Sequence, residues 1–163
     1  MIAIGDAGRV TDFVIRDAVL GDMGALQGVF RKASLSDGGY REVLLAHPEV
    51  LELPEEAVKE GRTRAAVAEG GIVGFASWLD AGEAVEVEDL FVDPDWMRHG
   101  IGRALMMDLI AIARGRGTGL VEVTANHHAL AFYEKVGFAV TGEVETRFGP
   151  APRMRLGVLP EPL

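Results

Sequence analysis

Residues 93–105 restrict the possible folds of this chain more than any other segment. They follow an apolar run typical of a strand, include Gly100 and Gly102, and lead into a long helical pattern. At the start of a helix the first backbone N–H groups have no partner within the helix, and the positive end of the helix dipole lies beside them. A phosphate can bind there without a cationic side chain. The sequence therefore predicts a strand, an anion-binding loop and a helix in direct succession.

The composition predicts a single globular domain covering residues 1–163. A chain of 163 residues with 48% hydrophobic content can bury a sizeable core. The absence of cysteine excludes disulfides, cysteine-ligated zinc and a cysteine nucleophile, which agrees with a cytoplasmic location. No signal-peptide pattern and no uncharged run of membrane-spanning length occurs, so we expect no membrane association.

The net charge narrows the class of partner. A formal charge of −9 disfavours nucleic acid, because phosphate backbones require a basic protein face. An acidic surface instead concentrates positive ligands. We therefore expect a cationic partner, such as an amine, and no nucleic acid.

The hydrophobic periods predict alternating strands and helices. Short apolar or alternating runs predict strands at 13–17, 63–69, 72–79, 84–92, 120–125, 138–143 and 154–158. Amphipathic patterns predict helices at 23–33, 40–47, 54–60, 100–114 and 128–136. Asp22 is the expected N-cap of the first helix, and Gly70-Gly71 the expected primed two-residue turn of a hairpin. Three antiparallel strands before the glycine loop favour an α+β fold with a mixed, mostly antiparallel sheet.

A dinucleotide-binding βαβ unit is the first alternative for the glycine loop. That motif has Gly-x-Gly-x-x-Gly directly after a strand and an acidic residue about 20 positions further on. Glu122 lies near that distance, but Leu105 occupies the third glycine position. A proline-containing loop also separates Val92 from Gly100. The sequence therefore disfavours a nicotinamide-binding domain.

Two motifs carry a resemblance to a known family. Leu90-Phe91-Val92-Asp93-Pro94 is followed by Met97-Arg98-His99-Gly100-Ile101-Gly102, close to a Gln/Arg-x-x-Gly-x-Gly/Ala pattern. About 25 residues later come Asn126, Ala129, Phe132, Tyr133, Lys135, Gly137 and Phe138. In this order the two motifs resemble the GNAT superfamily of N-acetyltransferases, over roughly residues 60–140. One departure is Met97 at the Gln/Arg position, and since main-chain N–H groups make most phosphate contacts, we expect weakened rather than lost binding.

The resemblance implies a three-layer α/β/α fold of the acyl-coenzyme A N-acyltransferase type, whose splayed sheet opens between strands 84–92 and 120–125. It implies acetyl-coenzyme A as cosubstrate and no metal. The pantetheine arm would add to the strand edge, and the pyrophosphate would bind at the helix start. The cofactor-binding residues implied are Leu90, Phe91, Val92, Arg98, His99, Gly100, Ile101, Gly102, Arg103, Asn126, Phe132 and Tyr133. A backbone N–H near Phe91 or Val92 would stabilise the oxyanion.

The catalytic roles implied fall on one tyrosine and a set of glutamates. Tyr133 would act as general acid toward the departing thiolate; the alternative is a core tyrosine packed beside Phe132. Glu88 and Glu86, which alternate onto one strand face, are the first candidates for general base, and Glu122 on the next strand is the third. The alternative is that these carboxylates line a solvated sheet face.

The reaction implied is direct transfer of an acetyl group to a primary amine in a ternary complex. The acceptor would be a small molecule or a peptide N-terminus, bound by helices within 22–60 and the segment 147–154. A non-catalytic acyl-coenzyme A-binding module, acting as sensor or interaction protein, is the alternative from another class. A homodimer through sheet edges or the C-terminal strand is also expected.

Overall fold

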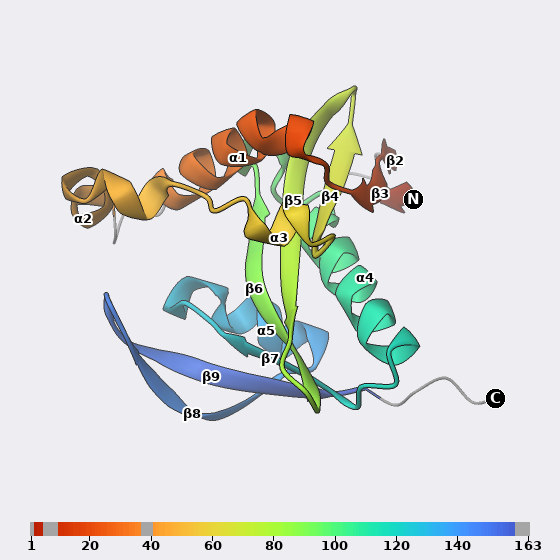
Figure 1. Ribbon diagram of the computed structural model, residues 1–163, viewed down its shortest axis with the longest axis vertical. Coiled ribbons are helices and arrows are strands. Elements are labelled where there is room, and N and C mark those ends of the chain that lie inside the picture. The colour runs from red at the N-terminus through yellow and green to blue at the C-terminus, as the bar shows by residue number, and fades with distance from the viewer. Residues whose placement is uncertain (1, 5–9, 37–40, 159–163) are drawn as a thin grey trace. The chain divides into compact units, whose positions relative to one another are not determined.

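The computed structural model describes residues 2–4, 10–36 and 41–158 (Figure 1). A two-stranded antiparallel sheet joins β1 (Ile2–Ile4) to β2 (Val10–Asp12). The remaining strands form a seven-stranded sheet in the order β3-β4-β5-β6-β7-β9-β8. They are β3 (Val14–Asp17), β4 (Thr63–Ala68), β5 (Gly71–Asp80), β6 (Ala84–Val92), β7 (Leu120–Thr124), β8 (Ala139–Thr146) and β9 (Gly149–Gly157).

Helices connect these strands. The α-helices are α1 (Met23–Leu35), α2 (Arg41–Ala46), α3 (Glu56–Lys59), α4 (Ile101–Gly115) and α5 (Leu130–Val136). Short 3-10 helices are η2 (Leu20–Asp22), η3 (Pro48–Leu51), η4 (Pro94–Trp96) and η5 (His127–Ala129). The β6–β7 pair is parallel, whereas β3–β4, β4–β5, β7–β9 and β8–β9 are antiparallel. The predicted α+β class with a mixed, mostly antiparallel sheet is therefore confirmed.

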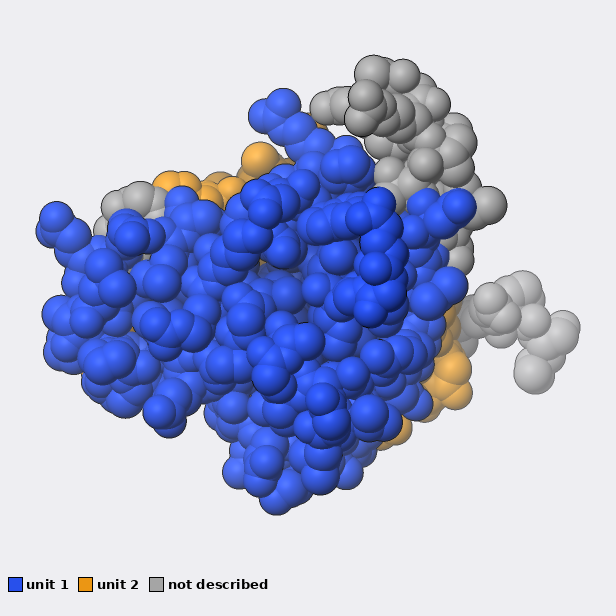
Figure 2. Space-filling model, turned by 90° about the horizontal axis from the view of Figure 1, so that it is seen from above, with its two compact units in different colours: residues 1–77, 89–106 blue, residues 78–88, 107–163 orange. Residues whose placement is uncertain are grey.

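The chain forms two compact units, coloured separately in Figure 2. Unit 1 comprises residues 1–77 and 89–106, and unit 2 comprises residues 78–88 and 107–163. The division passes through β5, β6 and α4, so each unit contains part of these elements.

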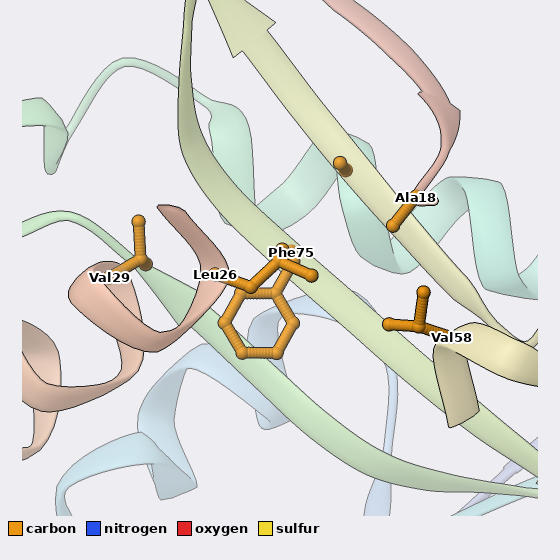
Figure 3. Packing of buried hydrophobic residues seen from close by; sticks show 6 residues of the cluster. Ala18, Leu26, Val29, Val58 and Phe75 are labelled. Carbon is orange, nitrogen blue, oxygen red and sulfur yellow. The ribbon is translucent and has the colours of Figure 1, made fainter. Parts of the chain in front are cut away.

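The core of unit 1 forms where α1 and α3 cover one face of the sheet. Leu26 and Val29 of α1 and Val58 of α3 pack with Phe75 of β5, whose side chain is 1% exposed (Figure 3). Alternate residues of a strand face opposite sides of the sheet. Phe75 therefore lies on the face that α1 and α3 cover, and Gly74 lies on the opposite face. Burying side chains of this size contributes roughly 1.5–3 kcal/mol each.

Gly74 allows α4 to lie close to the opposite face of this unit. A Cβ at Gly74 would lie 3.1 Å from the Ile101 Cγ2 atom and 3.3 Å from the Leu105 Cδ1 atom, both in the first turns of α4. It would also lie 3.1 Å from the Phe91 carbonyl oxygen of β6. Helices therefore cover both faces of the sheet in unit 1, and glycine at this position sets how closely α4 approaches.

A side-chain amide joins α1 to the segment that leads into α3. The Gln27 Nε2 atom donates to the Leu51 carbonyl oxygen, and the Leu53 backbone N–H donates to Gln27 Oε1 at 2.7 Å. The amide thus pairs with both a backbone donor and a backbone acceptor, in the way a neighbouring strand would. This contact fixes the extended segment against the helix.

The sheet of unit 2 opens between β6 and β7. The two strands pair from Ala84↔Leu120 to Val87↔Val123, but β6 continues to Val92. Strand pairing therefore ends five residues before β6 does. This arrangement confirms the predicted splayed sheet.

The structure corrects the predicted hairpin turn and the predicted N-cap of the first helix. The hairpin turn is Glu69-Gly70, with φ of 52° and 78°, rather than Gly70-Gly71, because Gly71 already pairs with Ala68. Both central residues have positive φ, so the predicted primed turn type is right and its position shifts by one residue. Asp22 does precede α1, but its carboxylate accepts from the Val19 backbone N–H instead of capping the helix.

The last two strands are longer than predicted. We expected strands at 138–143 and 154–158, and β8 and β9 instead run to Thr146 and start at Gly149. Cross-strand pairing from Ala139↔Arg155 to Thr146↔Gly149 extends both strands through residues of weak strand propensity. Of the predicted helix 40–47, residue 40 lies outside the described residues, and the rest forms α2.

Candidate functional site

The glycine loop turns sharply from β6 into α4. The Asp93 carboxylate accepts from the Asp95 backbone N–H at 2.9 Å and so caps η4. After η4, Arg98 and Gly100 adopt left-handed conformations with φ of 65° and 78°. A positive φ is uncommon for a residue other than glycine, so its occurrence at Arg98 marks local strain of the kind found at functional sites.

The start of α4 presents backbone donors beside cationic side chains. The first helical hydrogen bond recorded across this junction joins the Ala104 N–H to the Gly100 carbonyl oxygen at 3.0 Å. The N–H groups of residues 101–103 precede it and belong to the helix turn that has no internal acceptors. Ile101 is buried in the core, whereas the Arg98 and Arg103 side chains are exposed. This arrangement suits a phosphate group.

Met97 contributes an apolar side chain that faces solvent. Its side chain is 54% exposed and its backbone is extended. An apolar, solvent-facing side chain adds no donor to the loop. A phosphate bound here would therefore depend on the backbone and on the neighbouring arginines.

Lys32 of α1 contacts this loop, a link that the sequence did not indicate. Its Nζ atom lies 3.1 Å from Asp93 Oδ1 and 2.5 Å from Asp95 Oδ2. Lys32 is 61 and 63 positions from Asp93 and Asp95 in the chain, and no short-range pattern connects it to them. The contact fixes η4 against α1 at the entrance to the loop.

The end of β6 is anchored by an aromatic cluster. The Phe91 ring lies edge-on to Phe30 of α1 at 5.0 Å and 5.7 Å from Phe75. Leu90 is half-buried and Val92 is buried. Because this stretch lies beyond the last β6–β7 pair, it forms a backbone edge to which an extended amide-containing ligand can add.

Tyr133 of unit 2 lies in an aromatic group. Its ring centroid is 5.2 Å from that of Phe132 and 5.3 Å from that of Phe138, both edge-to-face. The residue is 5% exposed, and burial raises the pKa of the Tyr133 phenol. The phenol is therefore protonated at neutral pH, which is the state required of a proton donor.

Asn126 caps the start of η5. Its Oδ1 atom accepts from the Ala129 backbone N–H at 2.8 Å. The residue is exposed, and its amide nitrogen is not used by the cap. Capping and a ligand contact are therefore compatible.

The three candidate carboxylates differ in their surroundings. Arg153 donates to both oxygens of Glu86, at 2.6 and 2.7 Å, and to Glu122 Oε2 at 3.1 Å. These side chains are each about one-fifth to one-quarter exposed, at 22%, 20% and 25% for Glu86, Glu122 and Arg153. Hydrogen bonding to Glu86 raises the pKa of Arg153. Glu88, two residues further along β6, is exposed.

The predicted site residues fall into two groups. Unit 1 contains Leu90, Phe91, Val92 and the loop residues 98–103, and unit 2 contains Glu86, Glu88, Asn126, Phe132 and Tyr133. Sequence reasoning missed Lys32, Gly74 and Arg153. Glutamates expected on two neighbouring strands could have indicated a nearby cation, but nothing in the sequence identified that cation as Arg153.

Comparison with known proteins identifies the family. The model described as "Acetyltransferase (GNAT) domain" matches residues 60–140. Streptothricin acetyltransferase of Streptomyces lavendulae is 33% identical, over 80% of this chain and 83% of that protein. The chain belongs to the GNAT superfamily. Both motifs on which the resemblance depended lie within the matched region.

Other relatives extend the comparison within the GNAT superfamily. Glucosamine 6-phosphate N-acetyltransferase of Trypanosoma brucei brucei is 42% identical, over 42% of this chain, which spans about half (52%) of that relative. The N-acetyltransferase PaiA of Thermoplasma acidophilum, solved with coenzyme A, has a TM-score of 0.73 at 18% identity, covering 90% of this chain and 99% of that one. This likeness confirms the GNAT fold.

Among residues 2–4, 10–36 and 41–158, no helix combines the length and apolar character needed to cross a membrane. Within the same ranges, no three His, Asp or Glu side chains gather as a metal site requires. His127, one of two adjacent histidines, instead places Nε2 3.1 Å from the Pro150 carbonyl oxygen.

Proposed function

We propose that this GNAT protein transfers an acetyl group from acetyl-coenzyme A to a primary amine by direct attack in a ternary complex. The observation that carries the proposal is the loop before α4, where the left-handed residues Arg98 and Gly100 lead to unpaired N–H groups at a helix start. The family's N-acetyltransferase relatives support the reaction class.

The chain offers three contacts for coenzyme A. The N–H groups of residues 101–103, with Arg98 and Arg103, would hold the pyrophosphate, and the backbone of His99 and Gly100 would shape the loop around it. The edge of Leu90, Phe91 and Val92 would pair with the pantetheine amides. Asn126 and Phe132 would contact the same arm. Neighbours of the same fold, including an aminoglycoside 6'-N-acetyltransferase, were solved with coenzyme A.

The chain's own groups would act at three points of the transfer. A carboxylate would remove a proton from the attacking ammonium group. A backbone N–H of Phe91 or Val92 would donate to the carbonyl oxygen as negative charge develops on it. Tyr133 would donate its phenolic proton to the departing thiolate, and its protonated state at neutral pH supports this role.

Glu88 is the first choice for the general base. Both oxygens of Glu86 accept hydrogen bonds from Arg153, which holds that carboxylate against β9. Glu122 also accepts from Arg153. Glu88 is exposed and lies on the part of β6 beyond the last pair with β7. Glu86 is therefore the second choice and Glu122 the third.

The acceptor would be a cationic amine on a small molecule or a peptide N-terminus. The formal charge of −9 supports this class, because an acidic surface concentrates positive ligands. Relatives named for streptothricin, peptidyl-lysine and N-alpha acetylation are all named for amine acceptors or amine-bearing compounds. A homodimer and a cytoplasmic location stay predictions.

Calorimetric titration with acetyl-coenzyme A tests the proposal. We expect micromolar binding by the wild type and loss of binding in Gly100→Glu/Gly102→Glu, whose carboxylates would occupy the anion site. Gly70→Glu is the matched control, because Gly70 and Gly100 share a φ of 78° and open space surrounds Gly70. A folded wild type that does not bind would contradict the proposal. Binding without turnover of any amine in a panel would instead indicate the non-catalytic module.

A further inference from the structure

Arg153 joins three strands of unit 2 next to the place where β6 and β7 stop pairing. Besides both oxygens of Glu86 on β6 and one of Glu122 on β7, its Nη1 atom donates to the Thr124 hydroxyl at 3.2 Å. Glu86 and Glu122 are register partners, one position before the last β6–β7 pair. The guanidinium thus connects β6, β7 and its own strand, β9, at the opening of the sheet.

The two glutamates need a cation between them. Neighbouring strands lie about 4.8 Å apart, so two carboxylates in register face each other at short range. Like charges directly opposite one another in a sheet are destabilising, and partial burial reduces their screening by solvent. A planar guanidinium can donate to both carboxylates at once, whereas an ammonium group on a flexible stem cannot match this geometry.

We infer that Arg153 is a positioning residue: by holding Glu86 and Glu122 together, it fixes the point at which β6 leaves β7. The inference rests on the proposed function, because its consequence concerns pantetheine binding. Arg153 also holds Thr124, the last residue of β7, and Asn126, proposed to contact the pantetheine arm, follows two residues later in the same unit. If the two glutamates repel, the pairing of β6 with β7 shortens toward Ala84, and Asn126 shifts with the end of β7.

Two ligands distinguish a loss of pantetheine binding from a loss of phosphate binding at residues 97–103. Coenzyme A contains both the phosphates and pantetheine, whereas adenosine 3′-phosphate 5′-diphosphate contains the phosphates alone. We expect Arg153→Met to weaken coenzyme A binding about tenfold and to change binding of the fragment less than about twofold, by calorimetry. Circular dichroism at the temperature of the titration shows whether the variant is folded.

A charge-neutral variant tests the mechanism by rescue. Glu86→Gln/Glu122→Gln/Arg153→Met removes the cation and both anions together, and replacing a whole ionic cluster is often tolerated where removing one member is not. We expect this triple variant to regain most of the coenzyme A affinity. Arg155→Met, an exposed cation two residues along the same face of β9, is the matched control and should bind both ligands as the wild type does.

Each outcome of these titrations decides the inference. Selective loss of coenzyme A binding in Arg153→Met, with rescue in the triple variant, supports it. Unchanged affinity in a folded Arg153→Met protein, equal loss of both ligands, or failure of the rescue overturns it while leaving the proposed function intact. A wild type that binds neither ligand overturns the proposed function, and the inference with it.

Discussion

The phosphate loop of unit 1 (residues 97–103) depends on backbone groups, whereas the arginine cluster of unit 2 (Glu86, Glu122 and Arg153) depends on side chains. Residues 97–103 are consecutive, and their contribution to binding comes from backbone conformation and N–H groups. Glu86, Glu122 and Arg153 come from three strands and are at least 31 positions apart. We expect a backbone site to tolerate changes of side chain, whereas a side-chain network depends on every member. The following predictions test this contrast.

Gly74→Val is expected to have the largest effect, because it moves the backbone of the loop itself. Any Cβ at this position would crowd Ile101 and Leu105, and the Phe91 carbonyl oxygen cannot move without disturbing β6. We expect a loss of about 3 kcal/mol in the free energy of unfolding and weaker coenzyme A binding. Urea unfolding and calorimetry measure the two effects.

Gly71→Val is the control for this change. Gly71 lies in the same strand, is exposed, and has open space around it. Valine suits a strand, so stability should be unchanged or slightly higher. If Gly74→Val and Gly71→Val behaved alike, close approach of α4 to the sheet would not be what positions the loop.

Tyr133→Phe is expected to have a large effect on the reaction alone. Removal of the hydroxyl should lower kcat about 100-fold, a typical contribution of a general acid, with little change in the KM for acetyl-coenzyme A. Because burial raises the pKa of Tyr133, the wild-type phenol should also stay protonated above pH ~10, where an ordinary tyrosine loses its proton.

Steady-state kinetics over a pH series measures both expectations for Tyr133. Phe132→Leu, which alters the neighbouring ring without touching the hydroxyl, is the control for packing. Equal kcat values for wild type and Tyr133→Phe would show that this tyrosine serves the core alone.

The parts of the molecule that the sequence predicted are those determined by short-range patterns. The bounds of β6 and the start of α4 agree within a residue, because a strand, a Pro-containing loop and paired glycines each leave a local signature. The turn at Glu69-Gly70 was misplaced by one residue, since either adjacent pair satisfies a primed turn until the cross-strand register is known.

Long-range contacts account for what could not be predicted. The contact between Arg153 and Glu86 could be predicted only from the pairing of β9 with β7. The role of Gly74 likewise depends on α4 covering the face of β5 on which Gly74 lies. In both cases tertiary structure brings together residues that share no local pattern. The sequence therefore predicted the phosphate loop better than the surroundings of the candidate base.

Met97→Gln is expected to have a small effect. It tests whether the backbone of residues 97–103, and not the side chain at position 97, determines the affinity for coenzyme A. The substitution restores the polar residue common in the motif at an exposed position. Because backbone N–H groups carry most of the proposed contacts, we expect the affinity for coenzyme A to rise by no more than about threefold. Calorimetry measures it, with Met107→Gln on the exposed side of α4 as control. A much larger gain would mean that the missing side chain, rather than the backbone, limits binding.

Arg16→Met is expected to have the smallest effect, because it removes a short-range, largely exposed ion pair instead of a long-range cluster. Arg16 donates to both Asp22 oxygens at 2.8 and 3.0 Å, and together with the Val19 N–H it lowers the Asp22 pKa to about 2. A lowered pKa stabilises the fold above the unfolded value of 3.8, and this contribution is lost as the pH falls through about 2. At neutral pH we expect the variant to be less stable by about 0.5 kcal/mol in urea unfolding, with the difference from wild type vanishing near pH 2. A loss that persisted unchanged at acid pH would assign the effect to packing of the Arg16 stem instead of to its ion pair with Asp22.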